Sequence, residues 1–223
     1  MAPIPPVVPA GSMSRVPQPV LSLDNGFRLR PWRPADAAVL VRSCSDPDIL
    51  RWNRPEPLTP DEAREKIRRW GLRWREEEAA VWAITASTPI TLITPDAGPP
   101  TAVSAALDLP DGDPVGLPDG DPVGLIGLAD IDLRGGSAEF LYWLLPEGRG
   151  HGTALAATVR VSHWALDELG LHRLRITHSV ANPASCRVAL GAGFPLEGTL
   201  RSALLHADGW HDEHLHARIR GDR

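Results

Sequence analysis

A glycine-rich stretch in the second half of the chain has the residue types of an anion-binding loop. It runs from Pro146 to Gly152 with the sequence PEGRGHG, between a strand-like and a helix-like segment. Gly150 and Gly152 lack side chains, so backbone N–H groups there can approach a phosphate closely. The helix expected to follow adds unpaired N–H groups and a positive dipole end, and Arg149 adds a cation. The stretch predicts a site for a phosphate-bearing ligand.

Two common phosphate-binding loops do not fit this stretch. A Walker loop requires a lysine before Ser or Thr, and the stretch contains none. A dinucleotide-binding loop requires Gly or Ala three residues after Gly152, where Leu155 stands. The pattern that remains is Arg149-x-x-Gly152-x-Ala154.

This pattern resembles the acyl-CoA pyrophosphate loop of the GNAT acetyltransferases. Its context resembles the RimL/RimJ-like branch of that family, over about residues 27–87 and 123–219. The segments that carry the resemblance are Leu29-Arg30-Pro31 with Asp36, Trp82-Ala83-Ile84, the run from Ala138 to Gly152, Asn182-x-x-Ser185, Gly193-Phe194 and Glu197-Gly198.

The resemblance implies a fold and an activity. The expected fold is α/β: the GNAT fold, a mixed, mostly antiparallel central sheet flanked by helices on both faces. The expected enzyme is an N-acyltransferase that moves an acetyl group from acetyl-CoA, its co-substrate, to a primary amine by direct attack on the thioester. The acceptor would be a protein N-terminus or a small-molecule amine. The resemblance implies no metal, and a homodimer is compatible with it.

The resemblance also implies roles for individual residues. Asn182 would contact the pantetheine arm or the acceptor, and Ser185 would lie near the CoA sulfur and protonate the leaving thiolate. Backbone groups near Trp143, Leu144 and Leu145 would bind pantetheine, one N–H polarising the thioester carbonyl. The pyrophosphate would be cradled by Arg149, Gly150, His151, Gly152, Thr153 and Ala154.

The general acid and base are less well defined. Many GNAT enzymes carry a tyrosine acid where this chain has Ala189, and Tyr142, the only tyrosine, belongs to the strand motif. Ser185 is therefore the preferred acid, with a local helix cap as its structural alternative. Glu139 is the first choice of base, acting through water, or else a structural carboxylate. Asp130 and Asp132 are the reserves.

Two functional alternatives share these residues. One is a CoA-binding sensor or partner module of the same fold without transferase activity. The other is transfer of a larger acyl group, such as succinyl. Free-CoA release with amines separates the first from the main hypothesis, and competition between acyl-CoAs separates the second.

All eight histidines follow residue 150. On a strand, Asp212, His214 and His216 share one face, which is the minimum for a metal site. The polar face of a hairpin explains the same cluster, and we expect no metal.

The elements that must position these residues alternate between strands and helices. Thr59-Pro60-Asp61-Glu62 is a capping box that predicts a helix start. In chain order the pattern predicts a strand near Phe27; helices from Pro34 and over 60–78; strands over 79–86, 123–133 and 138–145; a helix over 152–169; a strand over 172–180; a short helix from Asn182; and strands over 198–206 and 211–219.

Two segments stand outside this pattern. Residues 1–22 are proline-rich and predict a disordered tail before one domain over 23–223, and translation from Met1 or Met13 is equally compatible. An acidic Pro/Gly/Asp-rich insertion is expected at about 88–122, where LPDGDPVG occurs twice in tandem from Leu109. Two octapeptides do not make a solenoid, so a tolerant surface loop is expected.

Composition limits the class of protein. The net charge of −5 argues against nucleic-acid or membrane partners. The two cysteines, with no apolar run long enough to span a bilayer and no leader pattern, favour a reduced, cytoplasmic protein. The charge is unevenly distributed: residues 76–133 hold 11 acidic and no basic side chains, which leaves a net charge of +6 elsewhere. That remainder includes the loop expected to bind a polyanion.

Overall fold

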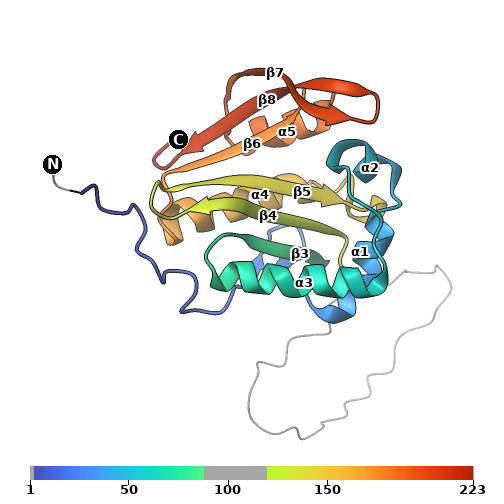
Figure 1. Ribbon diagram of the computed structural model, residues 1–223, viewed down its shortest axis with the longest axis horizontal. Coiled ribbons are helices and arrows are strands. Elements are labelled where there is room, and N and C mark those ends of the chain that lie inside the picture. The colour runs from blue at the N-terminus through green and yellow to red at the C-terminus, as the bar shows by residue number, and fades with distance from the viewer. Residues whose placement is uncertain (1–2, 88–119, 223) are drawn as a thin grey trace, which may run out of the picture.

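The computed structural model describes residues 3–87 and 120–222, so the duplicated octapeptide and most of the expected insertion lie outside the described residues. The described chain forms an eight-stranded sheet in the order β1-β2-β3-β4-β5-β6-β8-β7 (Figure 1). Neighbouring strands are antiparallel except β5 and β6, which are parallel. The predicted mixed, mostly antiparallel α/β fold is confirmed.

The strands are β1 (Leu21–Ser22), β2 (Phe27–Pro31), β3 (Ala80–Ala86), β4 (Gly124–Asp132), β5 (Ser137–Leu144), β6 (Arg173–Ser179), β7 (Leu196–His206) and β8 (Gly209–Ile219). The α-helices are α1 (Ala37–Ser43), α2 (Pro47–Asn53), α3 (Pro60–Arg75), α4 (Thr153–His163) and α5 (Pro183–Gly191). Short helical turns cover Pro34–Asp36, Pro146–Gly148 and Trp164–Glu168.

The sheet has a hydrophobic core on each face, because side chains alternate along its strands. On β3, Trp82 and Ile84 join the core under α4, whereas Val81 and Ala83 join the core under α1 and α3. Figure 1 shows α3 in front of the sheet and α4 behind it. Both faces of the sheet centre are therefore covered.

The helix starts follow local capping rules. The Thr59 hydroxyl accepts the Glu62 N–H and the Glu62 carboxylate accepts the Thr59 N–H, so the predicted capping box is confirmed. Helix α2 was not predicted, although Asp46 caps its first turn and Pro47 occupies its first position. That Asp-Pro pair was the available signal.

The N-terminal segment corrects one prediction. Residues 3–22 were expected to be disordered, yet Val8 and Met13 are almost completely buried in the core under α4. The indole N–H groups of Trp74 and Trp82 donate to the carbonyls of Val16 and Pro19. The prediction of disorder is wrong for these residues.

A single acidic side chain explains how a proline-rich segment is held. The Glu77 carboxylate accepts the backbone N–H groups of Gly11, Met13 and Ser14 at 2.8, 2.8 and 3.0 Å. Burial alone would raise the pKa of Glu77, but these three hydrogen bonds hold it below its usual value. Composition could not reveal a contact between residues more than sixty positions apart.

Candidate active site

The central feature of the site is the divergence of β5 from β6. The parallel pairing covers only Ser137–Glu139 of β5 against Arg173–Arg175 of β6. Beyond Glu139, carbonyls of β5 turn to other partners: Tyr142 O accepts from Asn53 Nδ2 and Leu144 O from Arg149 Nε, each at 3.0 Å. The N–H and C=O of one strand residue face the same side. The N–H groups of Tyr142 and Leu144 therefore face the opening between the strands.

The same alternation corrects the predicted pantetheine contacts. The Leu145 N–H donates to Val123 O, its carbonyl accepts from Gly148 N, and its side chain is buried. Leu145 therefore has no free N–H to offer to pantetheine, in contrast to what was predicted for this residue. The backbone of Trp143 faces β4, where it pairs with Leu125, so only the Trp143 side chain reaches the cavity at the end of β5. Of the three predicted residues, Leu144 alone presents its N–H to the opening.

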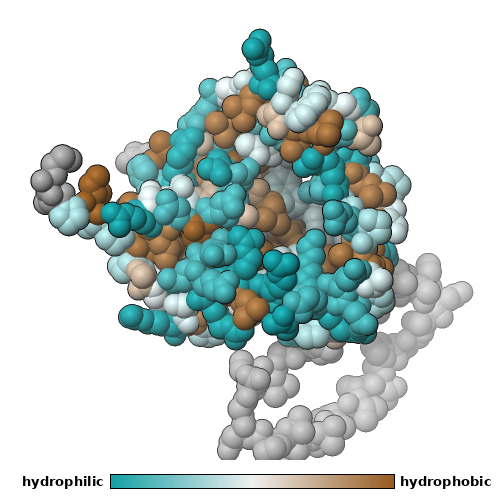
Figure 2. All heavy atoms as spheres, viewed as in Figure 1, coloured by the Kyte–Doolittle hydropathy of each residue, from teal (hydrophilic) through white to brown (hydrophobic). Residues whose placement is uncertain are grey.

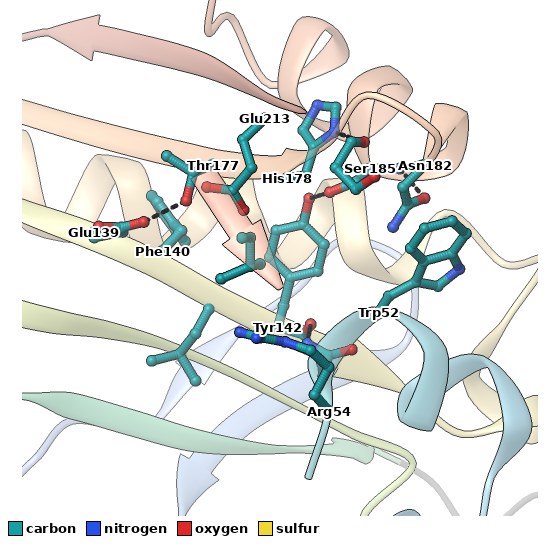
Figure 3. Close-up of a pocket in the computed structure, with 14 residues that line it drawn as sticks. Trp52, Arg54, Glu139, Phe140, Tyr142, Thr177, His178, Asn182, Ser185 and Glu213 are labelled. Carbon is teal, nitrogen blue, oxygen red and sulfur yellow. Dashed lines mark hydrogen bonds between the residues drawn. The ribbon is translucent and has the colours of Figure 1, made fainter. Parts of the chain in front are cut away.

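Two cavities meet at this opening. One, of about 400 Å³, is enclosed by α2, β5, β6, α5 and the β7–β8 ribbon (Figure 3). The other, of about 290 Å³, extends along the end of β5 towards α4. They are called here the acceptor cavity and the loop cavity. Figure 2 shows this face hollowed near its centre, with both hydrophilic and hydrophobic residues around the hollow. The residues that line both cavities are Trp52, Asn53, Tyr142, Asn182 and Ser185.

The glycine-rich loop has the geometry that an anion site requires. Gly150 and Gly152 have φ values of +80° and +67°, and a Cβ on either would meet no other atom within 4 Å. Gly152 caps α4, whose first intrahelical hydrogen bond runs from Ala156 N to Gly152 O. The N–H groups of Thr153, Ala154 and Leu155 precede that bond, so they are the groups left for a ligand.

The residues of this loop line two different hollows. Ala154 and Arg149 line the loop cavity, whereas His151 and Gly152 line a separate hollow between α4 and β1. Thr153 is buried and lines neither of these hollows. The structure therefore brings together six of the predicted residues around the loop cavity: Trp143, Leu144, Arg149, Ala154, Asn182 and Ser185.

Arg149 is already paired. Its guanidinium donates to Asp46 at 2.6 Å and to Asp48 at 2.8 Å, both at the start of α2. Burial alone would raise the pKa of Asp46, but the Ile49 N–H and Arg149 hold it below its usual value. The predicted phosphate cation thus links the loop to α2, a contact that the sequence did not indicate.

The junction of the cavities holds a hydroxyl pair. Tyr142 Oη and Ser185 Oγ lie 2.5 Å apart. Ser185 occupies the first turn of α5, where its N–H is capped by Asn182 Oδ1 at 3.1 Å. Burial raises the pKa of Tyr142 to about 12, so the phenol remains protonated at neutral pH. Tyr142, expected only as part of the strand motif, is thus the direct partner of the predicted acid.

The predicted base, Glu139, lines the acceptor cavity but is committed to other side chains. Its carboxylate accepts from Arg175 Nε at 2.7 Å and from Thr177 Oγ1 at 2.5 Å. Both carboxylate oxygens are therefore occupied, which is the structural alternative raised for this residue. The reserves, Asp130 and Asp132, do not line the acceptor cavity, and Asp132 caps the Gly135 N–H instead.

A second carboxylate in the acceptor cavity was missed. Glu213 on β8 is only 8% exposed, and no side chain in the described part of the chain hydrogen-bonds to it. Burial, together with the nearby Glu139 charge, raises its pKa above 4.5. Figure 3 shows Glu213 and Tyr142 pointing into the same cavity. The sequence did carry a signal for this residue: Glu213 alternates with Leu215 and Ala217, so it is an acid on the apolar face of its strand.

The chain is similar to known acetyltransferases. The family model described as acetyltransferase (GNAT) domain matches residues 27–195. The chain is 39% identical over 83 residues to the ribosomal-protein-serine acetyltransferase of Escherichia coli (strain K12), covering 37% of this chain and 46% of that protein. It is 35% identical over 89 residues to a putative ribosomal N-acetyltransferase of Bacillus subtilis (strain 168), covering 40% and 48%. These matches span about half the length of the relatives.

The fold agrees with solved structures. RimL, a ribosomal L7/L12 alpha-N-protein acetyltransferase solved in complex with coenzyme A, superimposes with a TM-score of 0.71 at 16% identity. The superposition covers 92% of this chain and all of that one. None of the helices in residues 3–87 and 120–222 combines the length and apolar character that a bilayer span requires.

Proposed function

Because the chain belongs to the GNAT acetyltransferase family, we propose that it transfers an acetyl group from acetyl-CoA to the N-terminal amine of a protein. One observation carries this proposal. The loop cavity, lined by Arg149 and Ala154 at the start of α4, and the acceptor cavity, lined by two carboxylates, meet at a single hydroxyl pair, Tyr142 and Ser185. A two-substrate transfer needs that arrangement, because each substrate must reach the same point from its own side.

Acetyl-CoA supplies the acetyl group as a thioester. The N–H groups at the start of α4 would hold its pyrophosphate, since they are unpaired within the helix and lie beside two side-chain-free glycines. The Leu144 N–H would polarise the thioester carbonyl from the opening between β5 and β6. The side chain of Trp143 would contact the pantetheine arm in the loop cavity.

The acceptor cavity would bind the amine and remove its proton. Glu139 and Glu213 line this cavity together with one cation, Arg54, and the Glu213 carboxylate is the one that would attract an ammonium group. Glu213 is the proposed base, because its raised pKa brings it closer to neutrality and its carboxylate is not held by other side chains. Glu139 is then a positioning residue that raises the pKa of Glu213 and fixes Thr177 and Arg175.

The hydroxyl pair would return a proton to the leaving thiolate. Ser185 is the proposed donor, as the sequence predicts, and the Tyr142 phenol would pass its proton to Ser185 through their 2.5 Å hydrogen bond. The negative charge left on the pair is shared between two hydrogen-bonded oxygens until Tyr142 regains a proton from solvent after the thiol has left. The acid is therefore proposed to be the pair rather than one residue.

A protein N-terminus is the proposed acceptor because both curated relatives are named for ribosomal acetylation. The acceptor cavity of about 400 Å³ suits one or two terminal residues with the remainder of a chain outside. Such an acceptor places the enzyme in the cytoplasm, consistent with two free cysteines in the described residues.

The decisive experiment measures free CoA released from acetyl-CoA with peptides of different N-terminal residues, the same peptides already N-acetylated, and a panel of small amines. We expect release with free N-termini and none with blocked ones. Release with small amines alone would overturn the protein acceptor but retain the enzyme. Tight CoA binding without release from any amine would replace the enzyme with a CoA-binding module.

Acyl-group preference needs a second measurement. Thermal stabilisation by acetyl-CoA, succinyl-CoA and free CoA compares the acyl groups directly. We expect acetyl-CoA and CoA to stabilise the protein and succinyl-CoA to do so less, because Glu139 and Glu213 repel a second carboxylate. Stronger stabilisation by succinyl-CoA would redirect the proposal to that acyl group.

A further inference from the structure

A cluster of four side chains beside Ser185 has no part in the proposed reaction. His178 on β6, His214 and His216 on β8 and Cys186 on α5 each offer one ligand atom, and these atoms lie within 4.8 Å of one another. His178 and His214 are direct register partners on neighbouring strands. Antiparallel pairing therefore fixes two of the ligands, and α5 brings the cysteine over them.

The rings of this cluster are oriented by backbone carbonyls. His178 Nδ1 lies 2.8 Å from Ser179 O, and His216 Nδ1 lies 3.0 Å from Phe194 O. A carbonyl oxygen only accepts hydrogen bonds, so Nδ1 carries the proton in both rings. Each Nε2 then holds a free lone pair, which is the form that binds a metal. His216 Nε2 lies 4.0 Å from Cys186 Sγ.

Buried atoms without partners give independent support. In the described residues, His178 Nε2 and His214 Nδ1 are buried and have no hydrogen-bond partner. His178 is 6% exposed and His216 is fully buried, so water does not solvate their rings freely. His178 stacks on His216 with 5.2 Å between the ring centroids. A cation among the ligand atoms would satisfy the nitrogens that lack partners.

We propose that His178, Cys186, His214 and His216 form a structural site for zinc. Three imidazoles and one thiolate make a tetrahedral set of the type zinc prefers. Ordinary zinc bond lengths place neighbouring ligand atoms about 3.5 Å apart, so the cluster needs to contract by about 1 Å. Binding converts the Cys186 thiol to a thiolate and releases one proton. The ion takes no part in acetyl transfer, and it amends the expectation of a metal-free protein.

The site would connect three elements of the fold. It links α5 to β6 and β8, which lie side by side at one end of the sheet (Figure 1). Asn182 and Ser185 stand at the start of α5, so the ion would hold the helix that carries them. Neither His211 nor Asp212 belongs to the set: His211 contacts Asp208, and Asp212 accepts the Ser202 N–H.

The test is zinc binding to full-length protein made without a histidine tag and stripped with a chelator. Competition against a chromophoric chelator should give one zinc per chain, and zinc should raise Tm by about 5 °C or more. His214→Ala should weaken binding at least about 100-fold, whereas His163→Ala, at an exposed position, should not change it. No binding, or equal binding by the two variants, would overturn the proposal as adventitious surface binding.

Cobalt substitution provides a readout that does not depend on the folding of a histidine variant. Co²⁺ in the site should show tetrahedral visible bands and a near-ultraviolet band from thiolate charge transfer. Cys186→Ser should remove the charge-transfer band, and the matched Cys44→Ser, at the other cysteine, should retain it. Retention of the band in Cys186→Ser would exclude this site. Because these readouts involve no acyl transfer, their failure leaves the proposed function unaffected.

Discussion

The two sides of the β5–β6 opening present different chemical groups to a ligand. The loop side offers backbone groups: the Leu144 N–H, the glycines of the loop and the first turn of α4. The acceptor side offers side chains from α2, β5, β6, α5 and β8. Backbone groups suit a ligand part that does not vary, such as a pyrophosphate, because every residue carries the same backbone. Side chains differ between sequences, so a side-chain surface can be adapted by mutation to different acceptors. The difference predicts that variants on one side change CoA affinity and variants on the other change turnover.

The largest effect is expected from Glu213→Gln on the acceptor side. Loss of the proposed base should lower kcat by about 1,000-fold, within the usual range for general-base removal, with CoA affinity unchanged. Steady-state kinetics and calorimetry measure the two quantities. Glu139→Gln is the matched variant and should lower kcat less, because that carboxylate is held by Arg175 and Thr177. A larger loss in Glu139→Gln would return the base to that residue.

Glu213 also gives a stability prediction with a defined sign. Its pKa is raised by folding above 4.5, so the folded state binds the proton more tightly than the unfolded state. Stability is therefore lost as pH rises from about 4.5 through the folded pKa. Glu213→Gln should be more stable than the wild type at neutral pH, and the difference should vanish below about pH 4. Urea unfolding at pH 4 and 7.5 tests this.

On the loop side, Gly152→Glu should weaken CoA binding by at least about 100-fold, because a carboxylate would face the pyrophosphate at a helix start. Strain at a positive φ adds roughly 1–2 kcal/mol to the cost of folding. Gly221→Glu is the matched control, since Gly221 also has a positive φ with open space around its Cβ. Unchanged CoA affinity in folded Gly152→Glu, measured by calorimetry, would remove the loop assignment.

The hydroxyl pair at the boundary should behave as one unit. Tyr142→Phe and Ser185→Ala should each lower kcat by about 10- to 100-fold. The double variant should be no slower than the worse single variant by more than about threefold, because the 2.5 Å hydrogen bond couples them. Strictly multiplicative losses would show that the two residues act separately.

The smallest change in CoA affinity is expected at the contact between Arg149 of the loop and Asp48 of α2. Asp48→Asn removes one of the two carboxylates that hold Arg149, and its side chain is 66% exposed. An exposed ion pair contributes little to stability, so its loss should leave the fold intact. CoA affinity should rise only about two- to fivefold, because the Arg149 guanidinium loses one of its two partners and can turn to the phosphate more easily. Asp61→Asn, another exposed acid, should have no effect. Weaker CoA binding in Asp48→Asn would show that the Arg149–Asp48 pair shapes the loop instead.

The elements that local chemistry dictates were predictable. The Thr59 capping box, the alternation along β3 and the glycine-rich loop each depend on residues within a few positions. The candidate phosphate loop could be proposed from the sequence for the same reason, because Gly150, Gly152 and the first turn of α4 are contiguous. Within the loop side, however, the sequence could not reveal the hydrogen bond from Leu145 N to Val123 O, because that bond depends on which side of β5 faces β4.

The sequence by itself determined the family and the order of most strands and helices along the chain, and it supplied the proposal for a polyanion-binding loop. Only the tertiary structure decided which carboxylate is free, because Glu139 and Glu213 are 74 positions apart and their difference lies in Arg175 and Thr177. It also decided that Glu77 anchors the N-terminal segment and that a histidine from β6 meets two from β8. Short-range patterns fix backbone shape, whereas hydrogen-bond competition between distant side chains is settled only when the sheet brings them together.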